Sequence, residues 1–131
     1  MENNSGPQNI TIGKTGVAKT TVSDSNTAKA VWSGSLDVFA TPMMIALMES
    51  AACECLADCM DAGQTSVGNK ISVEHTKASP IGAEIKASAT IEAIEGRRIV
   101  FAVAAGDGAG DNERDRAAGM LGHSDTSFLT V

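Results

Sequence analysis

A chain of 131 residues favours one compact domain, and its core must consist of small and aliphatic side chains because only 3% of the residues are aromatic. The formal net charge of −6 argues against a nucleic-acid partner, since binding to a phosphate backbone depends on clustered Lys and Arg. No apolar run approaches the roughly 20 residues of a membrane span, and the polar first residues do not resemble a signal peptide, so we expect a cytoplasmic protein without a membrane partner.

The chain begins with a polar segment that shows little periodicity. Residues 1–14 are therefore expected to form a flexible arm, followed by a single domain over residues 15–131. A first strand is expected from Thr15 to Val22. Residues 23–40 form a long connection with room for a further strand or a lid turn, and long loops in small domains are often functional.

The pattern changes to that of a helix from Thr41 to about Asp61. Thr41 is a good N-cap residue, and Pro42 suits the first helical position. Gly63 lies where a C-terminal stop is expected.

Alternating polar and apolar residues predict a run of strands after this helix. Alternation covers residues 66–77 and 83–95, a further strand is expected over the apolar residues 99–105, and a last strand lies near residues 121–131. A loop rich in Gly and Asp, residues 106–112, precedes the last strand. One strand, a long helix and then antiparallel strands indicate an α+β domain, with one helix packed on a curved sheet.

One carboxylate of the helix lies away from the others. On a helical wheel Ser50, Glu54, Asp58 and Asp61 share an arc of roughly 80°, whereas Glu49 falls about 140° from Glu54 among apolar neighbours. Burying a carboxylate is costly unless it is paired or used, and such groups are frequent at functional sites. The alternative is a glutamate at a helix edge or subunit seam whose carboxylate reaches water.

His75 is a similar exception in the predicted strand, because it shares a face with Ile71 and Val73. A histidine on an apolar face is often a core residue with its hydrogen bonds satisfied. Glu49 and His75 could instead meet in the interior, or in a pocket across a dimer seam, as an acid/base pair. Thr41 is a third candidate, for which simple helix capping is the alternative.

Metal chemistry finds little support in the sequence. Cys53, Cys55 and Cys59 are an odd, clustered set that matches neither a disulfide framework nor a zinc pattern, so we expect them to pack in the core. The acidic stretch from Asp107 to Glu113 lacks the residue order of a calcium loop and is interpreted as a solvated hairpin loop.

Several short segments of the chain occur together in one known family. They are Phe39-Ala40-Thr41-Pro42, Glu49-Ser50-Ala51-Ala52, Thr65-Ser66-Val67-Gly68, Val73-Glu74-His75 and Pro80-Ile81-Gly82. In this order and spacing the chain resembles, from about Gly16 to Ala105, the hotdog-fold thioesterases of the fluoroacetyl-CoA thioesterase type.

The resemblance implies a hotdog fold, in which a curved antiparallel sheet wraps around one long central helix. It also implies a homodimer, or a dimer of dimers, with active sites at the protomer interface. Such enzymes hydrolyse a small or medium acyl-CoA thioester to free acid and CoA without a metal or organic cofactor. Thr41, Glu49 and His75 match the catalytic residues, while Val67 and Gly68 match a stretch that binds substrate, where the Gly68 N–H could hold the carbonyl oxygen.

Two chemical routes are compatible with these residues. Glu49 could attack the thioester carbonyl to give an anhydride, or it could activate water. His75 would position or deprotonate water or stabilise charge, and Thr41 would hydrogen-bond Glu49 or the carbonyl. The last strand, Gly122 to Thr126, departs from the family's Gly-x-His-x-Arg-like pattern.

Other functions remain as alternatives to hydrolysis. A hotdog protein could bind acyl-CoA or another apolar ligand without turnover. An enoyl-CoA hydratase is a weaker alternative, because the sequence contains no convincing Asp/His hydration motif.

Overall fold

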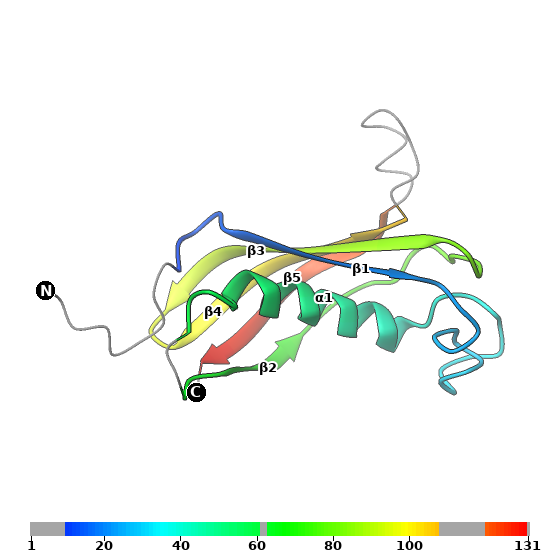
Figure 1. Cartoon of the computed structure of the whole chain (residues 1–131), viewed down its shortest axis with the longest axis horizontal. Coiled ribbons are helices and arrows are strands. Elements are labelled where there is room, and N and C mark those ends of the chain that lie inside the picture. Colours follow the sequence, from blue (N-terminus) through cyan, green and yellow to red (C-terminus); the bar gives the residue numbers. More distant parts are fainter. Residues whose placement is uncertain (1–9, 61–62, 108–119, 131) are drawn as a thin grey trace, which may run out of the picture.

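The computed structural model describes residues 10–60, 63–107 and 120–130. Its elements follow in the order β1 (Thr15–Thr21), α1 (Thr41–Leu56), β2 (Ser66–Ile71), β3 (Glu84–Glu95), β4 (Arg98–Gly106) and β5 (Met120–Thr130). All strand pairs are antiparallel and form one sheet in the order β1-β3-β4-β5-β2, and α1 lies across one face of that sheet (Figure 1). The predicted α+β layout is confirmed. No helix among the described residues is long and apolar enough to cross a membrane.

The central strands carry the core on alternate residues, as predicted. The buried side chains of β3 and β4 are Ile85, Ala87, Ala89, Ile91, Ile99, Phe101, Val103 and Ala105. The alternation of β3 weakens at Ala93, where the register with β4 shifts between Ile91 and Ala93. A bulge of this kind places an extra residue in one strand and bends it, which explains why Ala93 is only half-buried.

The helix packs on the β1, β3 and β4 side of the sheet. Its buried residues recur at the three- and four-residue spacing of one helical face: Met44, Leu47, Met48, Ala51, Ala52, Cys55 and Leu56. Gly16 of β1 allows the closest approach, because a Cβ built on this residue would lie 2.8 Å from the Cα of Cys55 and closer still to the Ala51 carbonyl oxygen. Small residues on both elements therefore set the distance between strand and helix.

Both ends of the helix differ from the sequence prediction. The N-cap is Ala40, whose carbonyl accepts hydrogen bonds from the Met43 and Met44 N–H groups, and no side chain caps the helix. The prediction that Thr41 is the N-cap is therefore wrong, because Thr41 is already helical. The helix ends at Leu56 and continues only as turns over residues 57–59, so the predicted end near residue 61 is about a turn too late.

The strand predicted over residues 66–77 is also shorter than expected. β2 ends at Ile71, and residues 72–79 belong to no helix or strand. β2 pairs only with β5, so its length depends on a single partner. The segment 72–79 is held at its end by a 2.9 Å hydrogen bond from the Phe39 N–H to the Ser79 carbonyl.

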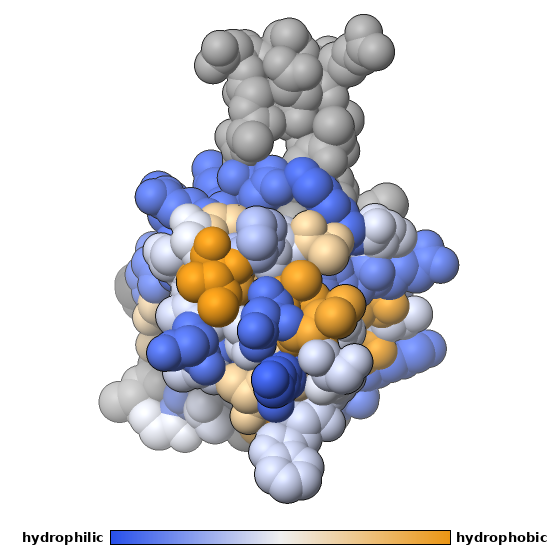
Figure 2. All heavy atoms as spheres, turned by 90° about the vertical axis from the view of Figure 1, so that its right-hand side faces the viewer, coloured by the Kyte–Doolittle hydropathy of each residue, from blue (hydrophilic) through white to orange (hydrophobic). Residues whose placement is uncertain are grey.

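The connection 23–40 folds back on itself beside the start of α1 (Figure 1). Its two arms meet in a 2.7 Å hydrogen bond from the Ala28 N–H to the Val38 carbonyl. Between them, Trp32 has a φ of 66° and is 94% exposed. Figure 2 views the molecule from this end and shows apolar groups separated by hydrophilic side chains.

Candidate active site

Thr41 and His75 meet at the start of α1. The Thr41 hydroxyl oxygen lies 2.8 Å from Nδ1 of His75, which joins the helix to the segment 72–79. Ala40 provides the backbone cap, so the Thr41 hydroxyl does not serve as a cap and can bond the imidazole instead. The structure thus gives Thr41 a role other than helix capping.

The His75 imidazole is held in its neutral form. Burial lowers its pKa below the ordinary value of 6.5, against a smaller opposing effect of the Lys77 backbone. Its Nε2 atom is buried and has no hydrogen-bond partner among the described residues. A neutral imidazole with one nitrogen engaged by a hydroxyl and the other unpartnered is suited to accept a proton or hold water.

A cavity of about 250 Å³ adjoins this pair. Thr41, His75 and Lys77 contribute to its lining, and the connection 23–40 supplies Ser33 and Val38. The long connection therefore forms part of the wall of a pocket that contains the histidine. Such a volume suits a small group rather than a large ligand, because drug-sized ligands occupy roughly 300–1,000 Å³.

Glu49 lies elsewhere on the helix. It is half-buried, with exposed Ala46 and Cys53 on the same flank, so the prediction that it points into the core is wrong. The sheet covers the face of the helix that contains Met48 and Ala52. The apolar residues next to Glu49 on the helical wheel, such as Ala46 and Cys53, lie outside that face. Glu49 therefore lies at the edge of the helix, which was the alternative interpretation.

Glu49 shares a cavity with Gly68 of β2. Both line a second cavity of about 200 Å³ between the helix and β2, together with Lys70 and Ile71. Val67, the other predicted substrate-binding residue, is 48% exposed and does not line this cavity.

The predicted site residues thus form two pairs within one chain. Thr41 and His75 share one cavity, while Glu49 and Gly68 share another. Glu49 lies eight positions after Thr41 in the helix, which corresponds to about 12 Å along the axis. No hydrogen bond joins Glu49 to Thr41 or to His75 in the described part of the chain.

An ion pair close to His75 in the chain, between Lys77 and Asp107, could not be predicted from the sequence. Lys77 Nζ lies 2.5 Å from Oδ2 of Asp107, which follows β4 directly. Lys77 and Asp107 are 30 positions apart in the chain. No sequence pattern indicates that the segment 72–79 contacts the loop at residue 107, which was interpreted as solvated.

Comparison with known proteins connects the chain to one family. The family model described as fluoroacetyl-CoA-specific thioesterase matches residues 22–112. A curated fluoroacetyl-CoA thioesterase from Streptantibioticus cattleyicolor is 40% identical over 72 residues, which are 55% of this chain and 52% of that protein. The chain thus matches about half the length of this curated relative.

Solved structures show the same architecture over nearly the whole chain. A Phe-to-Ala mutant of a fluoroacetyl-CoA-specific thioesterase, in complex with fluoroacetate and CoA, is 26% identical with a TM-score of 0.81, covering 93% of this chain and 95% of that one. A hot-dog-like protein from Thermanaerovibrio acidaminovorans is 22% identical with a TM-score of 0.74, covering 92% and 82%. The chain has the hotdog fold.

Proposed function

Because this chain belongs to the fluoroacetyl-CoA-specific thioesterase family, we propose that it hydrolyses an acyl-CoA thioester to a free acid and coenzyme A. The observation that carries the proposal is the contact of Thr41 with a neutral His75 beside a cavity. Both residues match the catalytic residues that the sequence resemblance implies. The cavity size supports a small or medium acyl group.

The active site is proposed to be shared between two copies of the chain in a homodimer. Glu49 and Gly68 lie at one cavity and Thr41 and His75 at another, so neither cavity alone carries the full set. In a twofold dimer each pair can face the complementary pair of the partner. Such an arrangement also accounts for a carboxylate on a helix flank that the protomer's own sheet leaves uncovered.

In the proposed reaction the Gly68 N–H holds the carbonyl oxygen and Glu49 supplies the base or the nucleophile. His75, neutral at pH 7, accepts a proton from water or positions it, and Thr41 fixes the orientation of the imidazole through Nδ1. Water adds across the carbonyl and the thiolate of CoA leaves with a proton. No metal or organic cofactor is part of the proposal. Three free cysteines agree with a cytoplasmic, reducing location.

The test is thiol release from a panel of short, aromatic and medium-chain acyl-CoA esters. We expect Glu49→Gln and His75→Ala to lower kcat by about 100-fold or more, the usual contribution of an acid/base group. Glu54→Gln is the matched control, because Glu54 is an exposed glutamate of the same helix, and it should change kcat less than twofold. Absence of thiol release from the whole panel would reject hydrolysis, and unchanged rates in both variants would reject the proposed roles of Glu49 and His75.

Binding without turnover is the second candidate, favoured because neither cavity of a single chain holds Thr41, Glu49 and His75 together. Calorimetry with a non-hydrolysable acyl-CoA analogue separates the two functions. Saturable binding together with no thiol release from the matching ester would favour the binding protein.

A further inference from the structure

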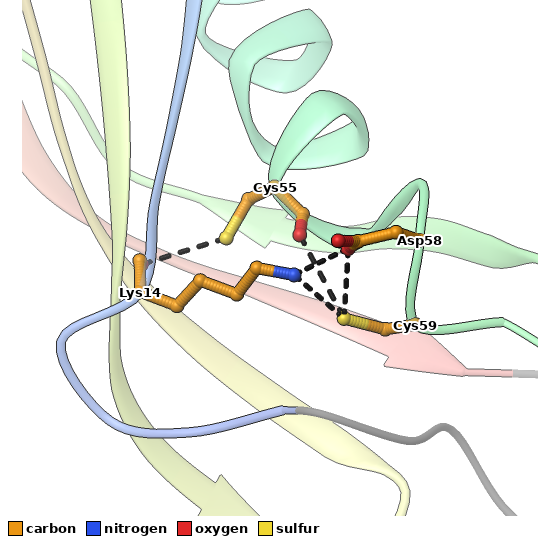
Figure 3. Close-up of polar contacts among 4 residues, drawn as sticks. All are labelled: Lys14, Cys55, Asp58 and Cys59. Atoms are coloured by element: carbon orange, nitrogen blue, oxygen red, sulfur yellow. Dashed lines mark hydrogen bonds and ion pairs between the residues drawn. The ribbon is translucent and has the colours of Figure 1, made fainter.

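A polar cluster lies at the opposite end of α1 from Thr41 and has no part in the proposed hydrolysis. Lys14, in the segment that leads into β1, donates from Nζ to Sγ of Cys59 at 2.9 Å and also pairs with the Asp58 carboxylate (Figure 3). The Cys59 thiol in turn lies 3.4 Å from Oδ1 of Asp58. An amine, a carboxylate and a thiol thus form a closed triangle between two segments that are 45 positions apart.

The charge of Lys14 favours reactivity at this sulfur. Hydrogen bonds to Asp58 and Cys59 raise the pKa of Lys14, so its amine is an ammonium at neutral pH. This ammonium lies 2.9 Å from the Cys59 sulfur and is placed to give a proton to a group that leaves during oxidation. The Asp58 carboxylate, 75% exposed, contacts the same sulfur from the solvent side.

The other two cysteines lack this environment. Cys53 is exposed, but partial burial of its thiol and the nearby charge of Glu49 raise its pKa. Cys55 is buried, and burial raises its pKa as well. Its sulfur points to the carbonyl oxygen of Lys14 at 3.4 Å, whereas the Cys59 sulfur points to the amine (Figure 3).

Access to Cys59 is narrow, because only 1% of the residue is exposed. This exposure excludes a bulky alkylating reagent. The side chain of Lys14 is itself 24% exposed and lines a cavity of about 450 Å³ beside Asp58, so solvent reaches the amine. The oxidant proposed for this cluster is therefore as small as hydrogen peroxide.

We propose that Cys59 and Lys14 form a reversible nitrogen–sulfur crosslink when the protein meets hydrogen peroxide. The Cys59 thiolate attacks one peroxide oxygen, so an S–O bond forms and the O–O bond breaks. The sulfur loses two electrons, the peroxide gains them, and the Lys14 ammonium gives its proton to the departing hydroxide, which leaves as water. The neutral amine, already 2.9 Å away, then attacks the sulfur of the sulfenic acid and expels a second water.

The product joins the entry of β1 to the turn after α1. It closes a loop of some 45 residues and constrains the unfolded chain, as a disulfide of that span would. Two equivalents of a thiol reverse the link, releasing amine and thiol and forming the disulfide of the reductant. Oxidation would thus link the end of the helix covalently to the start of β1. This link lies at the opposite end of α1 from Thr41, at a distance from the proposed site of hydrolysis.

The test treats the full chain with hydrogen peroxide and follows it by intact-mass spectrometry and peptide mapping. The crosslinked chain should weigh about 2 Da less than the reduced chain, with residues 14 and 59 in one joined peptide that dithiothreitol separates. A Cys55–Cys59 disulfide would give the same mass, so the measurement is repeated on Cys55→Ser, in which the loss should persist. Cys53→Ser is the matched control and should behave as the wild type.

Two Lys14 variants separate the charge from the bond. Lys14→Gln should form no crosslink and should slow the oxidation of Cys59 by about tenfold, because the cation is lost. Lys14→Arg keeps the charge, so Cys59 should still be oxidised to a sulfenic acid, seen as a gain of about 16 Da in intact mass, but without the crosslink. Circular dichroism confirms that each variant is folded. Loss of the 2 Da change in Cys55→Ser, oxidation of Cys53 before Cys59, or equal Cys59 oxidation in wild type and Lys14→Gln would overturn the proposal.

Discussion

The Thr41 hydroxyl is the clearest example of how a single atom gains its role from its neighbours. Because Ala40 provides the helix cap, Thr41 can bond His75 at 2.8 Å. Thr41→Val, which keeps the shape but loses the hydroxyl, should lower kcat about fivefold, since one hydrogen bond contributes about 1 kcal/mol. Thr41→Ser should retain most activity. Full activity in Thr41→Val, or a larger loss in Thr41→Ser than in Thr41→Val, would contradict this role of the hydroxyl.

The low pKa of His75 also affects stability. Because the folded-state pKa lies below 6.5, the unfolded chain binds this proton first as the pH falls. The contribution of the neutral His75 to the free energy of unfolding is thus fully present above about pH 6.5. This contribution is lost as the pH falls through the folded-state pKa. Urea unfolding between about pH 7.5 and 5 should show a smaller loss of stability in His75→Gln than in the wild type. Parallel curves would mean that burial does not depress this pKa.

At the scale of elements, the contact between β1 and α1 depends on Gly16. A methyl group there would meet the backbone of Ala51 and Cys55, which cannot move without shifting the whole helix. Gly16→Ala should therefore lower the free energy of unfolding by about 2–3 kcal/mol in urea titrations. Gly34→Ala is the control, because its nearest neighbour is the Ala28 side chain at 3.2 Å, and it should cost less than about 1 kcal/mol.

The segment 72–79 depends on contacts made by side chains rather than on strand pairing. Lys77 ties it to Asp107, and Asp107 is only 14% exposed. Lys77→Met should lower kcat several-fold by loosening the position of His75, and Asp107→Asn should do the same. The double variant should lose no more than about the larger single loss, because both changes remove one interaction. Additive losses in kcat would show that the two residues act independently.

Local pattern was sufficient for the fold but only partly for the site. Alternation identified β3, whereas β4 was predicted from an apolar run that buries every second residue in the structure. The end of β2 could not be predicted, since it depends on the length of pairing with β5, and residues 72–77 still alternate although they belong to no strand. The position of Glu49 was misjudged because a wheel shows an apolar arc but not which arc the sheet covers.

At the scale of the whole molecule, the two cavities predict a complementation experiment. If Glu49 of one chain works with His75 of the other, a mixed dimer of Glu49→Ala and His75→Ala chains contains one intact site. Random mixing makes half of the dimers mixed, so about a quarter of wild-type activity should return from two inactive proteins. Light scattering should show a dimer in each sample. No recovery despite subunit exchange would place all catalytic residues in one chain.

The connection 23–40 also lets one wall of the cavity beside His75 change independently of the rest of the fold. Its arms are joined at Ala28 and Val38, so residues 29–37 leave the scaffold and return to it at nearly the same place. The entropy of closing such a loop changes slowly with length, and neither the helix start nor the core depends on its tip. Replacing residues 29–37 can therefore alter the wall of the cavity while Thr41 and His75 keep their hydrogen bond. Under the proposed function, a change in this one stretch can therefore alter acyl preference while Thr41 and His75 stay in place.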